Sequence, residues 1–296
     1  MNKINIGNLK SIEALYKDSF ITVPKATIAR MGSTCTVGPK QCSAIRLFGK
    51  DISLPRMSSD QDTETIHANF WGPMERNEFF AIDPKYRVTA LLKEDYILKD
   101  SFNNGDRGGH DKAAEFQNEA DIMGNPTYRT LAYILAPIIQ LLDPEAAGSP
   151  ALTMKGHTAI ANVSPFPGLA MNGTKSNDKK LEQWAPLVRD ILQEQVNLYA
   201  PRLVYSGHVL YNFLSNKELY SSLVRGEAAD YGYVFDRRIV KAAVVSCPLS
   251  NPIGIYTDEQ GAIWLDENHP QNYTYYSDES IQRHIDSLLK GIRAVL

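Results

Sequence analysis

Polar residues lie at the ends of three apolar stretches of the chain, and their side chains are of the kinds that acid–base chemistry uses. Glu94 follows residues 88–92, Asn162 lies at the end of residues 157–163, and His269 follows residues 262–265. A carboxylate can orient water or stabilise a developing cation, and an amide can read a planar ligand edge through one donor and one acceptor. An imidazole can donate a hydrogen bond to developing negative charge. These three residues are therefore the candidate site.

Each of these residues also has a purely structural interpretation. Glu94 can be a solvated strand end, Asn162 can form the turn before a proline-rich stretch, and His269-Pro270 can be a loop dipeptide. Their occurrence in this order, each at the end of an apolar stretch, favours the functional interpretation. Both interpretations stay open at this point.

The elements that must position the candidate residues alternate between strand and helix. Apolar stretches predict strands at 88–92, 157–163, 201–207 and 262–265, and helical periodicity predicts a helix over 178–199. Ser277 predicts the N-cap of a final helix. This alternation predicts a three-layer α/β/α fold with a central, mainly parallel four-stranded sheet. The carboxyl ends of parallel strands share one edge, where ligands bind, so the candidate residues are expected there.

Two parts of the chain fall outside this repeated pattern. Residues 1–85 are predicted to be an N-terminal accessory region packed on the core, and Ile66, Phe70, Met74 and Phe79 in it have helical spacing. Residues 86–296 are predicted to be the α/β domain, with an insertion at about 216–261. Whether the N-terminal region gates the site, binds a partner or covers the sheet is open.

Composition excludes several classes of protein. The 296 residues carry a net charge of −3, which argues against a surface coated in positive charge for indiscriminate nucleic-acid binding. No apolar run approaches the ~20 residues that span a bilayer, and the first residues lack the apolar core of a signal peptide. Three cysteines make neither a disulfide framework nor a zinc quartet. We therefore expect a cytoplasmic, monomeric protein that does not bind membranes.

Common cofactor and metal motifs are absent from the sequence. The six histidines lack metal-ligand spacing, and no nucleophile elbow occurs. The loop NNGDRGGH (103–110) fits neither the dinucleotide-binding nor the P-loop pattern. It is interpreted as a surface loop or, alternatively, as backbone that approaches a phosphate. No metal and no cofactor are expected.

The order and spacing of these motifs resemble the uracil-DNA glycosylase superfamily, and a little-characterised bacterial branch of it most closely. Where the family's first strand ends in a motif of the form G-Q-D-P-Y, this chain reads Leu92-Lys93-Glu94-Asp95-Tyr96. Asn162 in AIANVSPFPG takes the position of the family's base-reading asparagine, and His269-Pro270-Gln271 takes that of its H-P-S loop. The resemblance covers roughly residues 86–285.

The resemblance implies a role for each matched residue. Glu94 would activate water and His269 would steady the departing base, so these two would be catalytic. The base would be held by Tyr96, Asn162 and Tyr128, and phosphates would be contacted by Lys93, Ser164, Lys175 and Gln271. The implied activity is hydrolysis of the N-glycosidic bond of a flipped, damaged base such as uracil, in double- or single-stranded DNA.

Two other functions remain open for the sequence. One is a catalytically inactive member of the same fold that binds nucleic acid. The other is a hydrolase that acts on a small nucleoside-like ligand. A basic surface near the site would favour the nucleic-acid functions, and a deep pocket with Glu94 facing Asn162 would favour the glycosylase.

Overall fold

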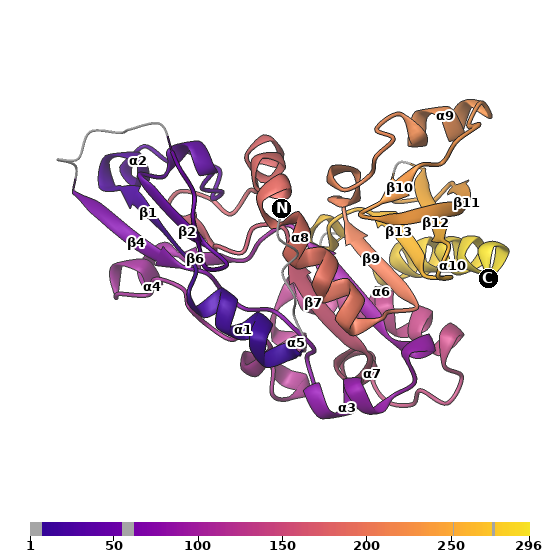
Figure 1. Cartoon of the computed structure of the whole chain (residues 1–296). Helices are drawn as coiled ribbons and strands as arrows, with labels where there is room; N and C mark the ends of the chain where they lie inside the picture. Colours follow the sequence, from indigo (N-terminus) through magenta and orange to yellow (C-terminus); the bar gives the residue numbers. More distant parts are fainter. Residues whose placement is uncertain (1–7, 55–61, 251, 274–275) are drawn as a thin grey trace. The chain divides into compact units, whose positions relative to one another are not determined.

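A computed structural model of the chain describes residues 8–54, 62–250, 252–273 and 276–296. Its largest sheet has seven strands in the order β10-β11-β12-β13-β9-β5-β7 and curls into a half-barrel (Figure 1). The strands are β10 Tyr233–Val234, β11 Arg237–Val245, β12 Ile253–Asp258, β13 Ile263–Glu267, β9 Leu203–Gly207, β5 Val88–Leu92 and β7 Thr158–Asn162.

Strand direction within this sheet is mixed. β9 is parallel to both β13 and β5, whereas β10, β11, β12 and β13 pair antiparallel in succession. The prediction of a four-stranded, mainly parallel central sheet is therefore wrong. The four expected strands are present as neighbours, but residues 233–258, interpreted as part of an insertion, extend the sheet by three strands. The antiparallel β12 occupies the backbone groups along one side of β13, which would otherwise be an unpaired edge.

Contact between residues divides the described chain into two compact units that alternate along the sequence. Unit 1 consists of residues 1–71, 93–112 and 162–198, and unit 2 consists of residues 72–92, 113–161 and 199–296. The seven-stranded sheet belongs to unit 2 except for Asn162, the last residue of β7, which belongs to unit 1.

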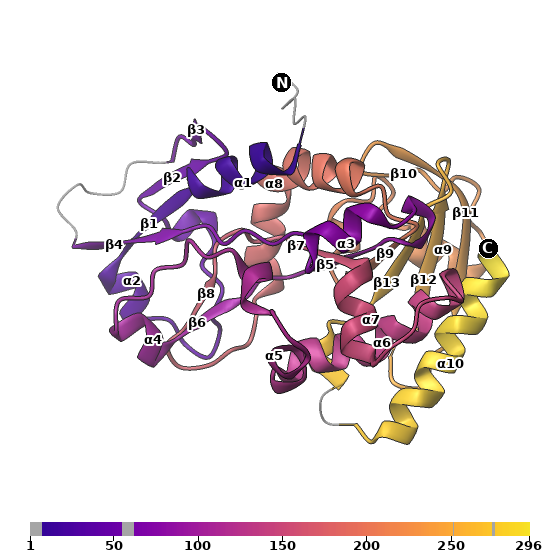
Figure 2. The ribbon, with the colours of Figure 1, turned by 90° about the horizontal axis from the view of Figure 1, so that it is seen from below.

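One face of the sheet of unit 2 is covered by an amphipathic helix. α10 (Asp278–Val295) lies against β11 and β12 (Figure 1), and the fit is close because a Cβ on Gly291 would come within 2.4 Å of Val245. The Ser277 hydroxyl caps this helix, as its position in the sequence predicts. α6 (Pro126–Leu142) and α7 (Pro150–His157) pack side by side (Figure 2), and α6 continues past Pro137 as one helix.

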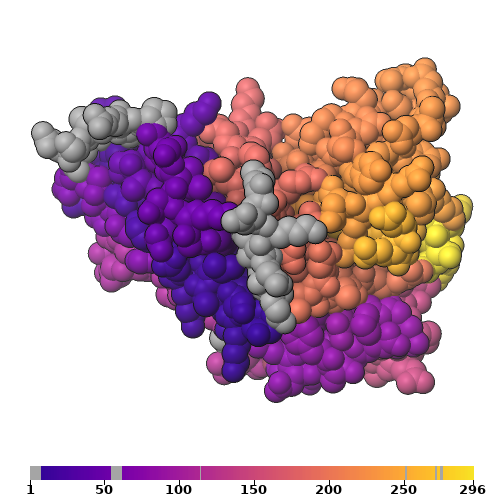
Figure 3. Space-filling view, viewed as in Figure 1, coloured from indigo at the N-terminus to yellow at the C-terminus, as the bar shows by residue number. Residues whose placement is uncertain are grey.

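The segment 210–225 of unit 2 contains two short helical elements. A 3₁₀ turn, η4 (Leu210–Asn212), follows β9, and a short helix, α9 (Leu219–Arg225), comes after it along the chain. α9 stands out from the surface of unit 2 in the space-filling view (Figure 3). Other short elements of unit 2 are α3 (Arg76–Ala81), η2 (Pro84–Tyr86), α5 (Glu119–Gly124) and η5 (Pro270–Tyr273), and η3 (Lys112–Glu115) belongs to it except for Lys112.

Unit 1 is built on a smaller antiparallel sheet with the strand order β3-β2-β1-β4. Ile66 lies in β4, which pairs with β1 along its whole length, and only Phe79 of the four helically spaced residues lies in a helix. The predicted helix over these residues is therefore wrong, because β-branched residues in TETIH favour a strand once a partner strand is available. The elements are β1 Phe20–Pro24, β2 Ala44–Leu47, β3 Lys50–Asp51, β4 Thr63–His67, α1 Leu9–Lys17, α2 Lys25–Ala29, η1 Pro39–Gln41 and α4 Lys99–Asn103.

A second part of unit 1 carries most of the candidate residues. β6 (Tyr96–Leu98) pairs in parallel with β8 (Gly168–Ala170), and α8 (Asp178–Tyr199) follows β8 along the chain. α8 has the bounds that its periodicity predicts, and its Trp184 is fully buried, with the indole N–H donating to the Val37 carbonyl at 2.8 Å. The segment before η1 is thus bound to α8.

Candidate functional site

Glu94 lies in unit 1, two residues beyond the end of β5. Every residue of β5 is buried, and the chain then turns through Lys93 to place Glu94 with only 9 % of its surface exposed. One carboxylate oxygen, Oε1, accepts a hydrogen bond from the Thr36 hydroxyl and another from the Cys35 thiol at 3.6 Å. Ser176 adds a further hydrogen bond to this carboxylate. Glu94 is therefore a buried carboxyl group held by neutral donors.

The surroundings of Glu94 set its protonation near neutral pH. Burial raises the pKa of Glu94 from 4.5 to about 7, and the negative charge of Asp95 adds to this rise. The hydrogen bonds from Thr36, Ser176 and Cys35 oppose it because they stabilise the ionised carboxylate. A group with a pKa near 7 can both take and return a proton at neutral pH.

Nearby titratable groups respond to the same burial. Burial raises the pKa of the Cys35 thiol well above its usual range, and the charge of Glu94 raises it further. Burial lowers the pKa of Lys180, and the negative charge of Glu94 opposes this shift. The Lys180 ammonium donates to the Thr36 carbonyl at 2.9 Å, which brings one positive charge to the segment that contacts Glu94.

Asn162 lies in the same unit, at the end of the neighbouring strand β7. Two residues later the Ser164 N–H donates to the Lys93 carbonyl at 2.9 Å, so the chain segments after β5 and β7 are joined beside Glu94. Among the described residues, the Oδ1 atom of Asn162 and the Oε2 atom of Glu94 are both buried and have no hydrogen-bond partner. Two adjacent strand ends thus each carry an acceptor that the described part of the protein leaves unused.

Unpaired buried acceptors cost free energy, about 1–3 kcal/mol each. They persist where a ligand or water completes them, and such sites are candidates for function. The arrangement can therefore accept hydrogen bonds from a ligand at two points, one of them at an ionisable oxygen.

The other predicted residues of unit 1 vary in their availability. Tyr96 is 38 % exposed on β6, and partial burial raises the pKa of its hydroxyl. The Lys93 ammonium pairs with Asp178 at 2.7 Å, and the buried Ser164 hydroxyl donates to the Phe166 carbonyl at 2.8 Å. Lys175 is exposed and its backbone pairs with Thr34. Phosphate contacts by Lys93, Ser164 and Lys175 stay predictions, and for the first two the side-chain polar groups already have protein partners.

The remaining predicted residues belong to unit 2. His269 follows β13, and its ring lies against Gly207, where an added Cβ would stand 3.3 Å from the ring carbon Cδ2. Tyr128 is buried on α6 and packs against Phe116 with ring centroids 4.5 Å apart. Gln271 lies in η5. The roles predicted for these three residues are not tested by the geometry of either unit and stay predictions.

The glycine-rich loop at 103–110 has a structural use. Gly108 has φ +76°, and a Cβ on it would come within 2.4 Å of the His67 carbonyl. The loop runs beside β4, where the His67 N–H donates to the Arg107 carbonyl at 2.8 Å. Glycine is therefore required at 108 for close packing of backbone on backbone.

The strongest features of the site were missed in the sequence. Cys35, Thr36, Ser176 and Lys180 surround Glu94, and none of them stands in a recognisable motif. Cys35 and Thr36 precede Glu94 by almost 60 residues and lie in the region predicted to be accessory. Only the tertiary fold reveals such a contact, because local periodicity carries no information about it.

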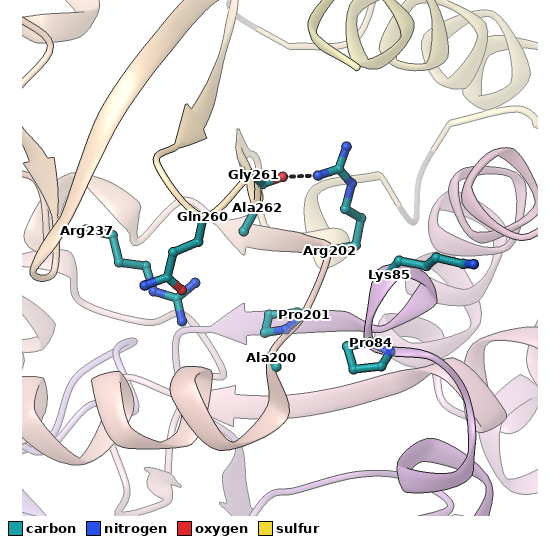
Figure 4. A pocket seen from close by; sticks show the side chains of 9 residues that line it. All are labelled: Pro84, Lys85, Ala200, Pro201, Arg202, Arg237, Gln260, Gly261 and Ala262. Atoms are coloured by element: carbon teal, nitrogen blue, oxygen red, sulfur yellow. Dashed lines mark hydrogen bonds between the residues drawn. The ribbon is translucent and has the colours of Figure 1, made fainter.

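Unit 2 also contains a cavity of about 310 Å³ at the opposite end of its parallel strands. It is lined by residues that precede β9 and β13, including Arg202, whose guanidinium donates to the Gly261 carbonyl (Figure 4). Arg237, another lining residue, is buried and paired with Asp258 at 3.3 Å. This cavity contains none of the predicted residues.

In the described residues, no group of three or more histidine, cysteine, aspartate or glutamate side chains is arranged to hold a metal ion. None of the helices in those residues combines the length and the apolar character that a membrane crossing requires.

Comparison with known proteins adds no relative to this description. No family model, no curated protein and no solved structure matches the chain. Function must therefore be inferred from the chemistry of the site and from the order of its motifs.

Proposed function

We propose that this protein hydrolyses the N-glycosidic bond of a damaged base in DNA, with Glu94 as the group that activates water, and that it is a member of the uracil-DNA glycosylase superfamily. The observation that carries the proposal is the Glu94 carboxyl, which is buried, has a pKa of about 7 and keeps one oxygen unpaired among the described residues. Structural carboxylates are rarely buried without a cation or a full set of donors. A perturbed carboxyl of this kind is typical of catalytic sites.

Asn162 supplies the second support. Its unpaired Oδ1 can accept a hydrogen bond from an N–H group of a planar base. A base that lacks this N–H would leave the acceptor buried and unsatisfied, and would therefore bind less well. The order of the motifs along the chain is the reason for proposing this superfamily rather than another class of hydrolase.

The chemistry required of Glu94 is simple. The bond between the sugar carbon and the base nitrogen breaks, and its electron pair leaves with the base. The sugar cation that forms is attacked by a water oxygen, and Glu94 Oε2 takes a proton from that water. The carboxylate also stabilises the developing positive charge on the sugar. Because the ionised form is needed, kcat/KM is expected to rise with pH and to level off above about pH 7.

The test is cleavage of end-labelled oligonucleotides, single- and double-stranded, that each carry one uracil, hypoxanthine, xanthine or oxidised pyrimidine. We expect alkali-labile sites at one of these bases, and Glu94→Gln is expected to slow the reaction roughly 10²- to 10⁴-fold. Asp62→Asn is the matched control, because Asp62 is an exposed carboxylate of the same unit, paired with Lys25.

Other results would identify a different function. Salt-sensitive binding to undamaged DNA without cleavage would indicate an inactive nucleic-acid binder. Release of free base from nucleosides, but not from DNA, would indicate a hydrolase of small nucleoside-like ligands. Either result, obtained with a protein that unfolds cooperatively, contradicts the proposal.

A further inference from the structure

The two oxygens of the Glu94 carboxyl have different environments. Oε1 accepts hydrogen bonds from the Thr36 hydroxyl and the Cys35 thiol, whereas Oε2 is buried with no partner among the described residues. The two oxygens of an ionised carboxylate are chemically equivalent until their neighbours distinguish them. Both of the donors that are assigned to a single oxygen, Thr36 and Cys35, lie at Oε1.

The Thr36 hydroxyl is oriented by a second hydrogen bond. Its oxygen accepts from the backbone N–H of Asn177 at 2.7 Å, and a backbone N–H can act only as a donor. The single hydroxyl proton of Thr36 is therefore directed at Glu94 Oε1. A proton on Oε1 would face that hydroxyl proton, so the carboxyl proton is more stable on Oε2.

The segment that carries Thr36 is fixed on both sides. The Cys35 N–H donates to the Lys175 carbonyl at 3.0 Å, and the Cys35 carbonyl accepts from the Leu169 N–H at 2.8 Å. The Thr36 carbonyl accepts from the Lys180 ammonium at 2.9 Å. Cys35 also packs so closely on Gly168 that a Cβ there would stand 2.9 Å from its sulfur. The donor is therefore held rigidly, which positioning requires.

We propose that Thr36 is a positioning residue that commits Oε1 of Glu94 to accepting hydrogen bonds and leaves Oε2 as the oxygen that exchanges a proton with water or ligand. The inference deepens the proposed function and rests on it for its catalytic meaning. It also gives part of the N-terminal region a defined role, because Thr36 belongs to residues 1–85. That region supplies a wall of the site.

The charged and titratable groups that act on Glu94 come from three segments. Cys35 precedes Thr36, Asp95 follows Glu94 in the chain, and Lys180 lies on α8. Loss of the Thr36 hydroxyl leaves all three in place. A change in Glu94 titration can therefore be assigned to the hydroxyl, provided that the fold is retained.

The first measurement reports protonation and does not depend on activity. The carboxyl C=O band of Glu94 is followed by infrared difference spectroscopy across pH, and it is identified by its loss in Glu94→Gln. Thr36→Val is expected to move the Glu94 midpoint upward by about one pH unit, because a hydrogen bond that favours the ionised form is removed. Thr36→Ser keeps the hydroxyl and is expected to keep the midpoint.

Controls separate a local effect from a folding defect. Thr65→Val changes an exposed threonine on β4 of the same unit and is expected to leave the Glu94 midpoint unchanged. Thermal unfolding is recorded for every variant, and Thr36→Ala replaces Thr36→Val if the latter does not fold. An unchanged midpoint in a folded variant that lacks the Thr36 hydroxyl would overturn the inference.

The second measurement uses the base-excision assay. The midpoint of the pH profile of kcat/KM should move upward with the spectroscopic midpoint in Thr36→Val and should be restored in Thr36→Ser. A spectroscopic shift in a protein that excises no base would refute the proposed function and leave the positioning of the carboxyl proton established. Base excision by a folded Thr36→Val variant whose spectroscopic midpoint is unshifted would support the proposed function and refute the positioning role of Thr36.

Discussion

At the scale of single residues, Glu94 is kept in a state that favours chemistry over stability. The unfolded chain would ionise this carboxyl near pH 4.5, whereas the folded protein holds its proton until about pH 7. Between these values the folded state binds more protons than the unfolded state, so the free energy of unfolding falls as pH rises. Above about pH 7 the buried charge reduces stability by a constant amount.

Compared with the unsubstituted protein, Glu94→Gln is therefore expected to have a more favourable free energy of unfolding at high pH than at low pH. The amide is neutral at all pH values, so the decline in stability between about pH 4.5 and pH 7 should become smaller in the variant. Urea unfolding at pH 5 and pH 8 measures this difference. Burial also raises the pKa of Asp266 to about 7, so Asp266 accounts for a further part of the decline in stability. The pH dependence of unfolding in Asp266→Asn measures that part. An unchanged pH slope in Glu94→Gln would show that the group titrates normally.

At the scale of elements, one buried carboxylate, Glu267, anchors the segment of unit 2 that follows β13. Glu267, at the end of β13, is hydrogen-bonded to His284 of α10 at 2.9 Å and to the Tyr273 hydroxyl of η5 at 2.5 Å. It also accepts from the Asn268 N–H at 2.6 Å, and the Asn268 carbonyl accepts from the Tyr205 hydroxyl. His269 therefore lies on a segment anchored at both ends.

Removal of this anchor is expected to be costly. Glu267→Ala leaves the buried His284 and Tyr273 groups without their partner, and we expect a loss of about 3–5 kcal/mol in the free energy of unfolding. Glu279→Ala removes a carboxylate that pairs with Arg283 on the exposed face of the same helix, and it should cost less than about 1 kcal/mol. Urea unfolding of both variants provides the comparison. Equal losses would show that Glu267 is not an anchor.

At the scale of the whole molecule, the two units are interleaved in sequence. The chain passes from one unit to the other after Trp71, Leu92, Lys112, Ala161 and Leu198, so neither unit is a continuous piece. Unit 1 needs residues from before residue 72 and from after residue 92 to complete its structure. The boundary at residue 85, placed between an accessory region and a catalytic domain, divides the chain within unit 2 and separates Thr36 from Glu94.

A fragment of residues 86–296 should therefore fail to form unit 1. It lacks β1, β2 and β4, together with the Cys35 and Thr36 side chains that contact Glu94. We expect broad, non-cooperative unfolding and poor dispersion of amide NMR signals from residues 93–112 and 162–198. Residues 1–85 added as a separate chain should restore part of the dispersion. Cooperative unfolding of the fragment alone would establish residues 86–296 as an independent domain.

Elements whose signals are local can be predicted from residue order alone. β5, β7, β9 and β13 lie within about two residues of their predicted bounds, and α8 and the cap of α10 are confirmed, because apolar runs, helical periodicity and a capping serine act within a few residues. The order of Glu94, Asn162 and His269 along the chain was likewise visible.

Features that depend on distant partners follow from the folded chain and not from local sequence. Three strands from residues 233–258 extend the sheet beyond β13, and Ile66 lies in a strand because β1 pairs with β4. Thr36 reaches Glu94 across 58 positions of sequence, and the unpaired oxygen of Glu94 is defined by that contact. Strand pairing, burial and hydrogen bonding between distant segments arise from the packed chain as a whole. Residue spacing could therefore predict Glu94 as a candidate carboxylate, but it could predict neither the pKa of that group nor which of its oxygens is unpaired.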